Sequence, residues 1–329
     1  MMGAASPLAR SLEPQSPDDG SASCPAGTPR LSMAHSSGPP DIEALCVSLQ
    51  EDQVERKFAI QMEAGIIQRI SARVVRGLGL DHEATEAQRK SAWGRAERIV
   101  KRGLGGDDQA EEDAAIAAAL ADNLAMAAAS LAPVAAFRKQ VEARMEGKAE
   151  RLPGFDLTLR MPGFKARGLA VIIGEAGNLS NYATVRKLWR RLGLGMAPGH
   201  EEHAYSTWRM KGGLNADDWT AAGYSPKRLG QVYGVVTVPL VMNKGKNRYG
   251  ELYVARRART LVTHPEWYLD KNGKMKLGPD GKPSSGHASA DAARIITKAL
   301  LSDLWSEWRG SRASVNAGSE LAPAEPIAA

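Results

Sequence analysis

The residue types best suited to chemistry in this chain gather around one tight turn, Pro162-Gly163-Phe164. An apolar residue, the Pro-Gly pair and a new apolar segment follow one another there, which is the layout of a helix-hairpin-helix. Such a turn exposes backbone N–H groups at the start of a helix, where a nucleic-acid phosphate binds without its base being read. We therefore expect a phosphate-facing turn made of Gly163, Phe164, Lys165 and Arg167. An ordinary Pro-Gly turn between packed helices is the alternative, because Lys165 stands where the motif has a second glycine.

Basic side chains recur after this turn and are the second predicted contact with phosphates. They are Arg186, Lys187, Arg190, Arg191, Lys227, Arg228, Lys244, Lys246 and Arg248, followed by Arg256, Arg257 and Arg259. The first four share one face of a predicted helix, while Val185, Leu188, Trp189 and Leu192 share the other. Solvated helix faces are the alternative interpretation.

Net charge separates the two halves of the chain. Residues 151–312 contain 26 Lys and Arg against 13 Asp and Glu, whereas residues 1–150 contain 17 against 22. A surplus of 13 positive charges favours a polyanionic partner. DNA is the expected partner and RNA the second choice.

The segment from Gly174 to Leu194 resembles the carboxy-terminal domain of DEDD-type insertion-sequence transposases. That family has a Pro-Gly-apolar-Gly hairpin, a helix ending in Glu-x-Gly-Asp, an aromatic residue, a further helix and a Gly-Leu pair. The matching positions here are Pro162-Gly163-Phe164, Glu175-Ala176-Gly177-Asn178, Tyr182, Leu188 and Gly193-Leu194. A weaker similarity continues through Tyr224-Ser-Pro-Lys-Arg and Lys244-Gly-Lys-Asn-Arg-Tyr to about residue 309.

The family's recombination chemistry, as the resemblance implies it, needs four metal-binding carboxylates in a RuvC-like domain and a nucleophilic serine. Residues 41–150 show helical patterning throughout, and the strand ends that would hold such carboxylates are missing. Ser206 and Ser225 are the candidate nucleophiles, but neither stands in the family's Ser-Gly context, and a serine before Pro226 is more often a helix cap. We therefore expect no autonomous catalysis, no metal and no cofactor.

The elements that must position these residues are helices. Residues 1–40 and 313–329 are predicted to be disordered tails, with Met33 as an alternative start. Residues 41–150 are predicted to form a helical, coiled-coil-like arm, in which separate helices begin near Asp41 and Phe58 and another pair is broken near Pro133. Residues 151–312 are predicted to be a basic helical domain with a polar hairpin insertion at 268–283 and a last helix at about 289–309. The predicted apolar face of that last helix consists of Ala292, Ile295, Ile296, Ala299, Leu300, Leu304 and Trp308. The predicted fold class is thus mainly α.

Several other classes of protein are disfavoured. Two cysteines, Cys24 and Cys46, do not make a disulfide scaffold, and no apolar run is long enough for a membrane span or a secretory signal. His200 and His203 lie in a loop-like context without a third ligand. We expect a bacterial, cytoplasmic protein.

Three functions remain open from the sequence. The first is a DNA-binding protein of mobile-element or phage origin. The second is a serine recombinase subunit that works with a separate RuvC-like partner. The third is an oligomeric scaffold built through the helices of 41–150.

Overall fold

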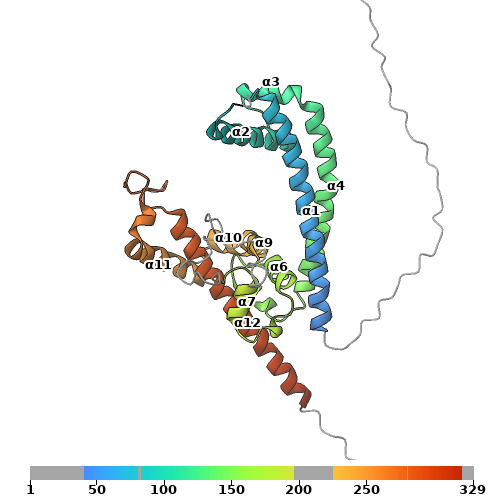
Figure 1. Ribbon diagram of the computed structural model, residues 1–329. Helices are drawn as coiled ribbons and strands as arrows, with labels where there is room; N and C mark the ends of the chain where they lie inside the picture. The colour runs from blue at the N-terminus through green and yellow to red at the C-terminus, as the bar shows by residue number, and fades with distance from the viewer. Residues whose placement is uncertain (1–40, 81–82, 196–224, 280, 321–329) are drawn as a thin grey trace, which may run out of the picture. The chain divides into compact units, whose positions relative to one another are not determined.

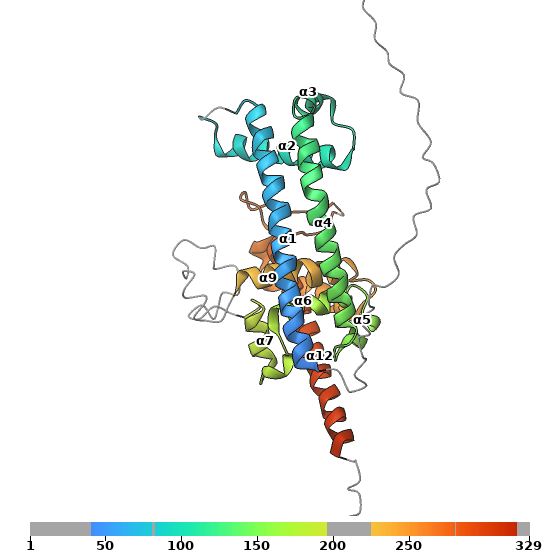
Figure 2. The ribbon, with the colours of Figure 1, turned by 90° about the vertical axis from the view of Figure 1, so that its right-hand side faces the viewer.

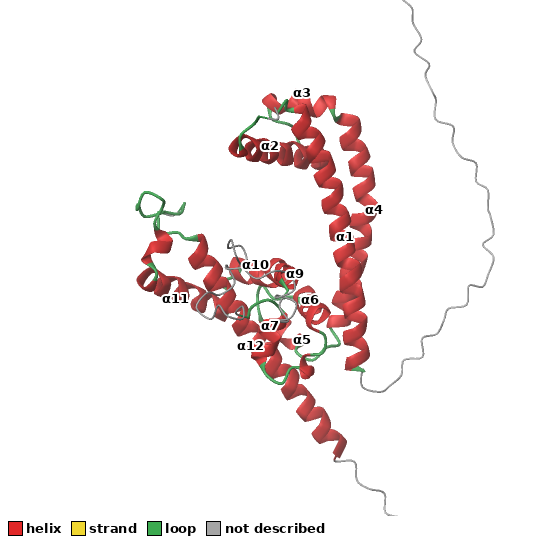
Figure 3. Ribbon diagram, viewed as in Figure 1, coloured by secondary structure: helices red, strands yellow, loops and turns green. Residues whose placement is uncertain are grey.

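The computed structural model describes residues 41–80, 83–195, 225–279 and 281–320. These residues form helices joined by short turns, and among them there is no β-strand, only two isolated bridges (Figure 3). The predicted mainly α fold is thereby confirmed.

The arm consists of two long helices, α1 (Ile42–Gly77) and α4 (Ala121–Ala149), which lie side by side along their length (Figures 1 and 2). α1 begins where the Asp41 carboxylate accepts hydrogen bonds from the backbone N–H groups of Glu43 and Ala44. It is one uninterrupted helix, so the prediction of two helices between Asp41 and Gly77 was wrong. The apolar positions on both sides of Phe58 pack against the same partner, and no residue between them breaks the helix.

α2 (Glu86–Gly105) and α3 (Glu111–Ala119) close the end of the arm. They cover a small cluster to which α1 contributes Ile70 and Val74, and α4 contributes Leu124 and Ala127. The predicted break near Pro133 was wrong, because α4 runs through that proline and the chain bends at Leu120 instead. A proline removes one helical hydrogen bond, and α4 packs against its neighbours on both sides of Pro133. No single described helix is long and apolar enough to cross a membrane; α3 and α4 pass that test only as a pair, bent by 76°.

The basic half is built from shorter helices around a long one. These are α5 (Phe155–Arg160), α6 (Ala166–Ala176), η1 (Leu179–Asn181), α7 (Val185–Arg191), α9 (Pro226–Val232), the π-helix η3 (Tyr233–Thr237), α10 (Val238–Met242), α11 (Arg248–Thr263), η4 (Pro265–Tyr268) and α12 (Gly286–Glu320). One hydrophobic cluster joins them to the base of the arm, since Leu49 of α1 and Met145 of α4 belong to it together with α6, α7, α9, α11 and α12.

α12 is the helix around which the basic half packs. The predicted apolar face is confirmed at Ala292, Ile296, Leu300, Leu304 and Trp308, which are all fully buried. The indole Nε1 of Trp308 donates to Asn178 Oδ1 over 3.1 Å, so the only polar atom of the ring is satisfied. Burial of this stripe fixes α12 against the segment that precedes α7.

Candidate nucleic-acid interface

The turn at Gly163 is packed against a neighbouring helix. Gly163 has φ +92°, and a Cβ built there would lie 2.6 Å from the carbonyl oxygen of Pro239 in α10, so only glycine fits. Phe164, the next residue, is fully buried in the main core. The prediction that Phe164 faces a phosphate was therefore wrong: its ring is a core side chain. Lys165, at the N-cap of α6, is exposed.

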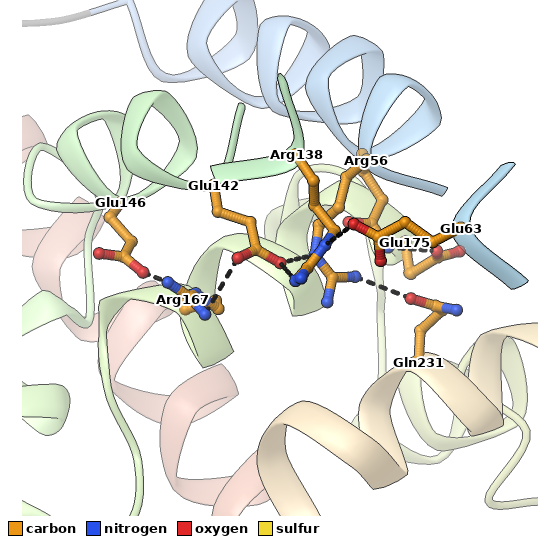
Figure 4. A network of polar contacts seen from close by, with 9 residues as sticks. Arg56, Glu63, Arg138, Glu142, Glu146, Arg167, Glu175 and Gln231 are labelled. Carbon is orange, nitrogen blue, oxygen red and sulfur yellow. Dashed lines mark hydrogen bonds and ion pairs between the residues drawn. The ribbon is translucent and has the colours of Figure 1, made fainter. Parts of the chain in front are cut away.

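Arg167 is engaged inside the protein. Its guanidinium lies 3.1 Å from Glu142 and 2.7 Å from Glu146, and both carboxylates belong to α4 (Figure 4). A second pair of contacts joins the same region, because Arg56 of α1 lies 2.9 Å from Glu142 and 2.8 Å from the amide oxygen of Gln231 in α9. This network attaches the arm to α6 and α9. The charge of Arg167 is balanced by two carboxylates, so its position needs no bound phosphate to explain it.

Asn247 links the same turn to α11 and is a residue that the sequence analysis did not single out. Its Nδ2 lies 3.0 Å from Pro162 O, 3.1 Å from Leu240 O and 2.9 Å from Asn243 O, and its Oδ1 accepts from Gly250 N over 3.0 Å. Asparagine is a preferred N-cap residue, so its position directly before the helix that starts at Arg248 is the signal by which Asn247 could have been found.

α7 has the two faces that its sequence predicted, except at Arg191, which is half-buried. Leu188 and Leu192 are fully buried, whereas Arg186, Lys187 and Arg190 are exposed, and no ion pair holds these three within the described part of the chain. The periodicity of the sequence is sufficient to produce this result, since residues three and four apart share a helix face. Three cations of α7 are thus available to a polyanion.

Arg191, the last residue of α7, lies close to Arg228 of α9. Glycine makes this approach feasible, because a Cβ on Gly193 would lie 2.8 Å from Leu229 Cβ and 3.0 Å from Ser225 O. Burial, and after it the positive charge of Arg191, lowers the pKa of Arg228 below its ordinary value. Within the described residues the buried Nε of Arg191 has no hydrogen-bond partner. Two arginines far apart in the sequence therefore share one small region.

Glu175 is the carboxylate nearest to this pair, and it is already surrounded by donors. Gln53 Nε2 lies 2.8 Å away, Lys57 Nζ 3.1 Å and Arg228 Nε 3.5 Å, while the carboxylate is almost fully buried. The single negative charge of Glu175 thus faces three positive charges, those of Lys57, Arg228 and the adjacent Arg191. The arrangement leaves excess positive charge, which an anion such as a phosphate would neutralise.

Tyr182 stands beside the two arginines. Its hydroxyl donates to the Ala176 carbonyl over 2.7 Å, and burial raises its pKa although the positive charges of Arg191 and Arg228 act in the opposite direction. The tyrosine therefore stays neutral and contributes packing to the site. It occupies the aromatic position of the transposase resemblance, and in the structure this position lies next to the basic pair.

A further cation packs against α7. Lys298 of α12 lies over the ring of Trp189, 5.1 Å from its centroid. Burial, followed by the charge of Arg294, lowers the pKa of Lys298 to about 8. For both Arg228 and Lys298, burial and a neighbouring arginine thus destabilise the charged form of the side chain. A bound anion would stabilise that charged form.

The remaining predicted cations divide into two groups. Lys227, Lys244 and Lys246 are exposed and make no ion pair within the ranges that the structure describes. Arg248 pairs with Asp303 and lies 5.1 Å from the centroid of the Tyr249 ring. Arg256 pairs with Asp291 at 2.5 Å, and Arg257 donates to Pro283 O over 3.1 Å. The three arginines Arg248, Arg256 and Arg257 therefore stabilise the packing of α11.

Of the two candidate nucleophiles, the structure describes only Ser225. Ser225 is the N-cap of α9, where its Oγ accepts from Arg228 N over 3.4 Å, as expected of a serine before Pro226. Ser206, like His200 and His203, lies outside the described residues. In the described residues no group of three or more His, Cys, Asp or Glu side chains is placed to hold a metal ion. The recombinase-subunit hypothesis stays a prediction from the resemblance.

Comparison with known proteins gives no match: no protein-family model, no curated protein and no solved structure is similar to this chain.

Proposed function

We propose that this chain is a nucleic-acid-binding protein whose phosphate contacts centre on Arg191 and Arg228. The observation that carries the proposal is the proximity of these two arginines to each other beside a single carboxylate, Glu175, which is already paired with Lys57. The same two helices, α7 and α9, also carry exposed cations, which we include in the basic face, namely Arg186, Lys187, Arg190 and Lys227. Such a face binds the phosphate backbone and not the bases. The resemblance to transposases makes DNA the expected partner, with RNA as the alternative.

The resemblance to insertion-sequence transposases adds a biological setting to this proposal. It favours a protein of mobile-element or phage origin that binds nucleic acid without cutting it by itself. Within the described residues of the arm, all regular elements are helices.

The test is the binding of the full chain to labelled duplex DNA, single-stranded DNA and structured RNA over a salt series. Replacing Arg191 and Arg228 by Gln should weaken binding about 10- to 100-fold at low salt and reduce the slope of log K against log salt by about two, one for each phosphate contact. The matched control is Arg98→Gln with Arg102→Gln on α2, which removes the same charge outside the proposed face. Equal losses in both variants, or no binding by the parent at low salt, would contradict the proposal.

A second function, self-association through the arm, is favoured by one observation. α1 carries exposed apolar side chains at Val47, Val54, Phe58 and Met62, which are 46%, 63%, 59% and 43% exposed. Their spacing of seven, four and four residues places them in one stripe. We propose that a second copy of the chain covers this stripe, as in the scaffold hypothesis.

Sedimentation of the full chain checks this. The parent should sediment as a dimer or larger species at micromolar concentration, and Val54→Glu with Phe58→Glu should give monomers. Leu252→Glu with Val254→Glu on α11, where the side chains are 46% and 59% exposed, is the control and should keep the association. A monomeric parent would refute the pairing of arms.

A further inference from the structure

A stacked pair of aromatic rings lies at the junction of α11 and α12, away from the arginine pair. The imidazole of His264 lies parallel to the indole of Trp267, with ring centroids 4.3 Å apart and an interplanar angle of 8°. His287, in the first turn of α12, stands on the same cluster at 6.2 Å from Trp267 and is tilted by 51°. Three aromatic rings from two segments thus gather at one place.

The His264 ring is partly accessible to solvent. Its side chain is 44% exposed, and Trp267 contacts both His264 and His287. Glu266 lies 3.2 Å from His264 Nδ1 and fixes the plane of the imidazole. A ring that is already oriented loses little conformational freedom when another flat ring adds to it.

The backbone under the stack is well anchored. Tyr268, the residue after Trp267, is almost fully buried, and its hydroxyl bonds to Thr260 Oγ1 at 2.9 Å and donates to Arg257 O over 3.0 Å. Asp270 then accepts from the N–H groups of Asn272 and Lys274, which shapes the following turn. The aromatic pair is therefore presented by a rigid base and not by a loose loop.

The adjoining extension carries exposed basic side chains. Lys271, Lys274 and Lys276 all lie within ten residues of Trp267 and are exposed. Neither the core nor the proposed basic face uses any of them. Flat rings beside cations are the combination that binds unpaired nucleobases, since a base stacks on the ring while the cations contact its phosphates.

We infer that the His264–Trp267 stack is a platform for an unpaired nucleobase, so that the protein holds a single-stranded segment beside the stretch bound by Arg191 and Arg228. The inference rests on the proposed nucleic-acid binding and adds what the arginines do not supply, a contact that distinguishes unpaired from paired bases. α12 joins the two regions: His287 at the platform and Lys298 against α7 are eleven residues apart, or about 16 Å at 1.5 Å per residue. A strand of about ten nucleotides is long enough to reach both.

The experiment compares four labelled probes on the full chain: a 20-nucleotide oligothymidine, the same length of abasic DNA, an oligouridine and a DNA duplex. His264→Ala and Trp267→Ala should each weaken binding of oligothymidine about tenfold, with little effect on the abasic strand or the duplex. Trp267→Phe keeps a stacking ring and should restore binding to within about threefold of the parent. Trp93→Ala, at an exposed tryptophan of α2, is the matched control and should change nothing.

The outcomes separate this inference from the proposed function. Equal losses on abasic and natural strands, or unchanged binding of oligothymidine by both alanine variants, would overturn the platform while leaving salt-dependent duplex binding intact. Failure of the parent to bind any of the four probes would overturn the proposed function and the platform together. A preference for oligouridine over oligothymidine in the parent, lost with His264→Ala, would support the platform and identify RNA as the strand that uses the stack.

Discussion

Replacing Glu142 by Ala is expected to lower the free energy of unfolding by about 3 to 5 kcal/mol. Glu142 is 2% exposed, and its carboxylate lies 2.9 Å from Arg56, 3.4 Å from Arg138 and 3.1 Å from Arg167. The Arg56 side chain is itself only 7% exposed, so the substitution leaves a buried guanidinium that keeps Gln231 but loses the carboxylate paired with it. Urea unfolding followed by circular dichroism gives the measurement.

Glu146→Ala is the matched control, because Glu146 stands one helical turn further along α4, is a partly exposed carboxylate and pairs with Arg167. A pair of this kind contributes about 1 kcal/mol or less. A second variant, Arg56→Met with Glu142→Leu, removes charge and countercharge together and should recover most of the lost stability. If Glu142→Ala costs no more than Glu146→Ala, the network does not attach the arm to the basic half.

Replacing Gly250 by Ala is expected to reduce the free energy of unfolding by at least about 4 kcal/mol, a loss on the scale of severe backbone overlap. A Cβ at this position would lie 1.5 Å from the carbonyl oxygen of Lys244 and 2.3 Å from its carbonyl carbon. The backbone cannot yield without moving Asn247, whose side chain holds Pro162, Leu240 and the first turn of α11 together. Thermal and urea unfolding of the purified variant measure the effect.

Gly65→Ala is the control, since Gly65 lies inside α1 and a Cβ there would meet nothing within 4 Å. Alanine restricts the unfolded chain and favours the helix, so this variant should be about 0.5 to 1 kcal/mol more stable than the parent. Opposite signs for the two glycines are the expected pattern. A Gly250→Ala protein as stable as the parent would show that residues 244–247 do not pack closely against α11.

The helix faces were readable from the sequence to a considerable extent. Leu188 and Leu192 on α7 follow the apolar periodicity of the chain, as do Ile296 and Trp308 on α12, and all four are buried as expected. The prediction failed where a local signal competed with packing. Pro133 is typical of a helix break but lies inside α4, whereas the bend at Leu120 occurs in an alanine-rich run without any breaking residue.

Residue types at fixed local spacing were enough to predict that this protein is helical, that its second half is basic and which face of α7 carries most of its cations. Which of these cations remain available to a partner depends on how the helices pack. Arg167 is taken up by Glu142 and Glu146, whereas Arg191 and Arg228 are left with excess positive charge. An ion pair depends on distance in space and not on separation along the chain. Arg56 and Glu142, for example, form an ion pair although 86 residues separate them in the sequence.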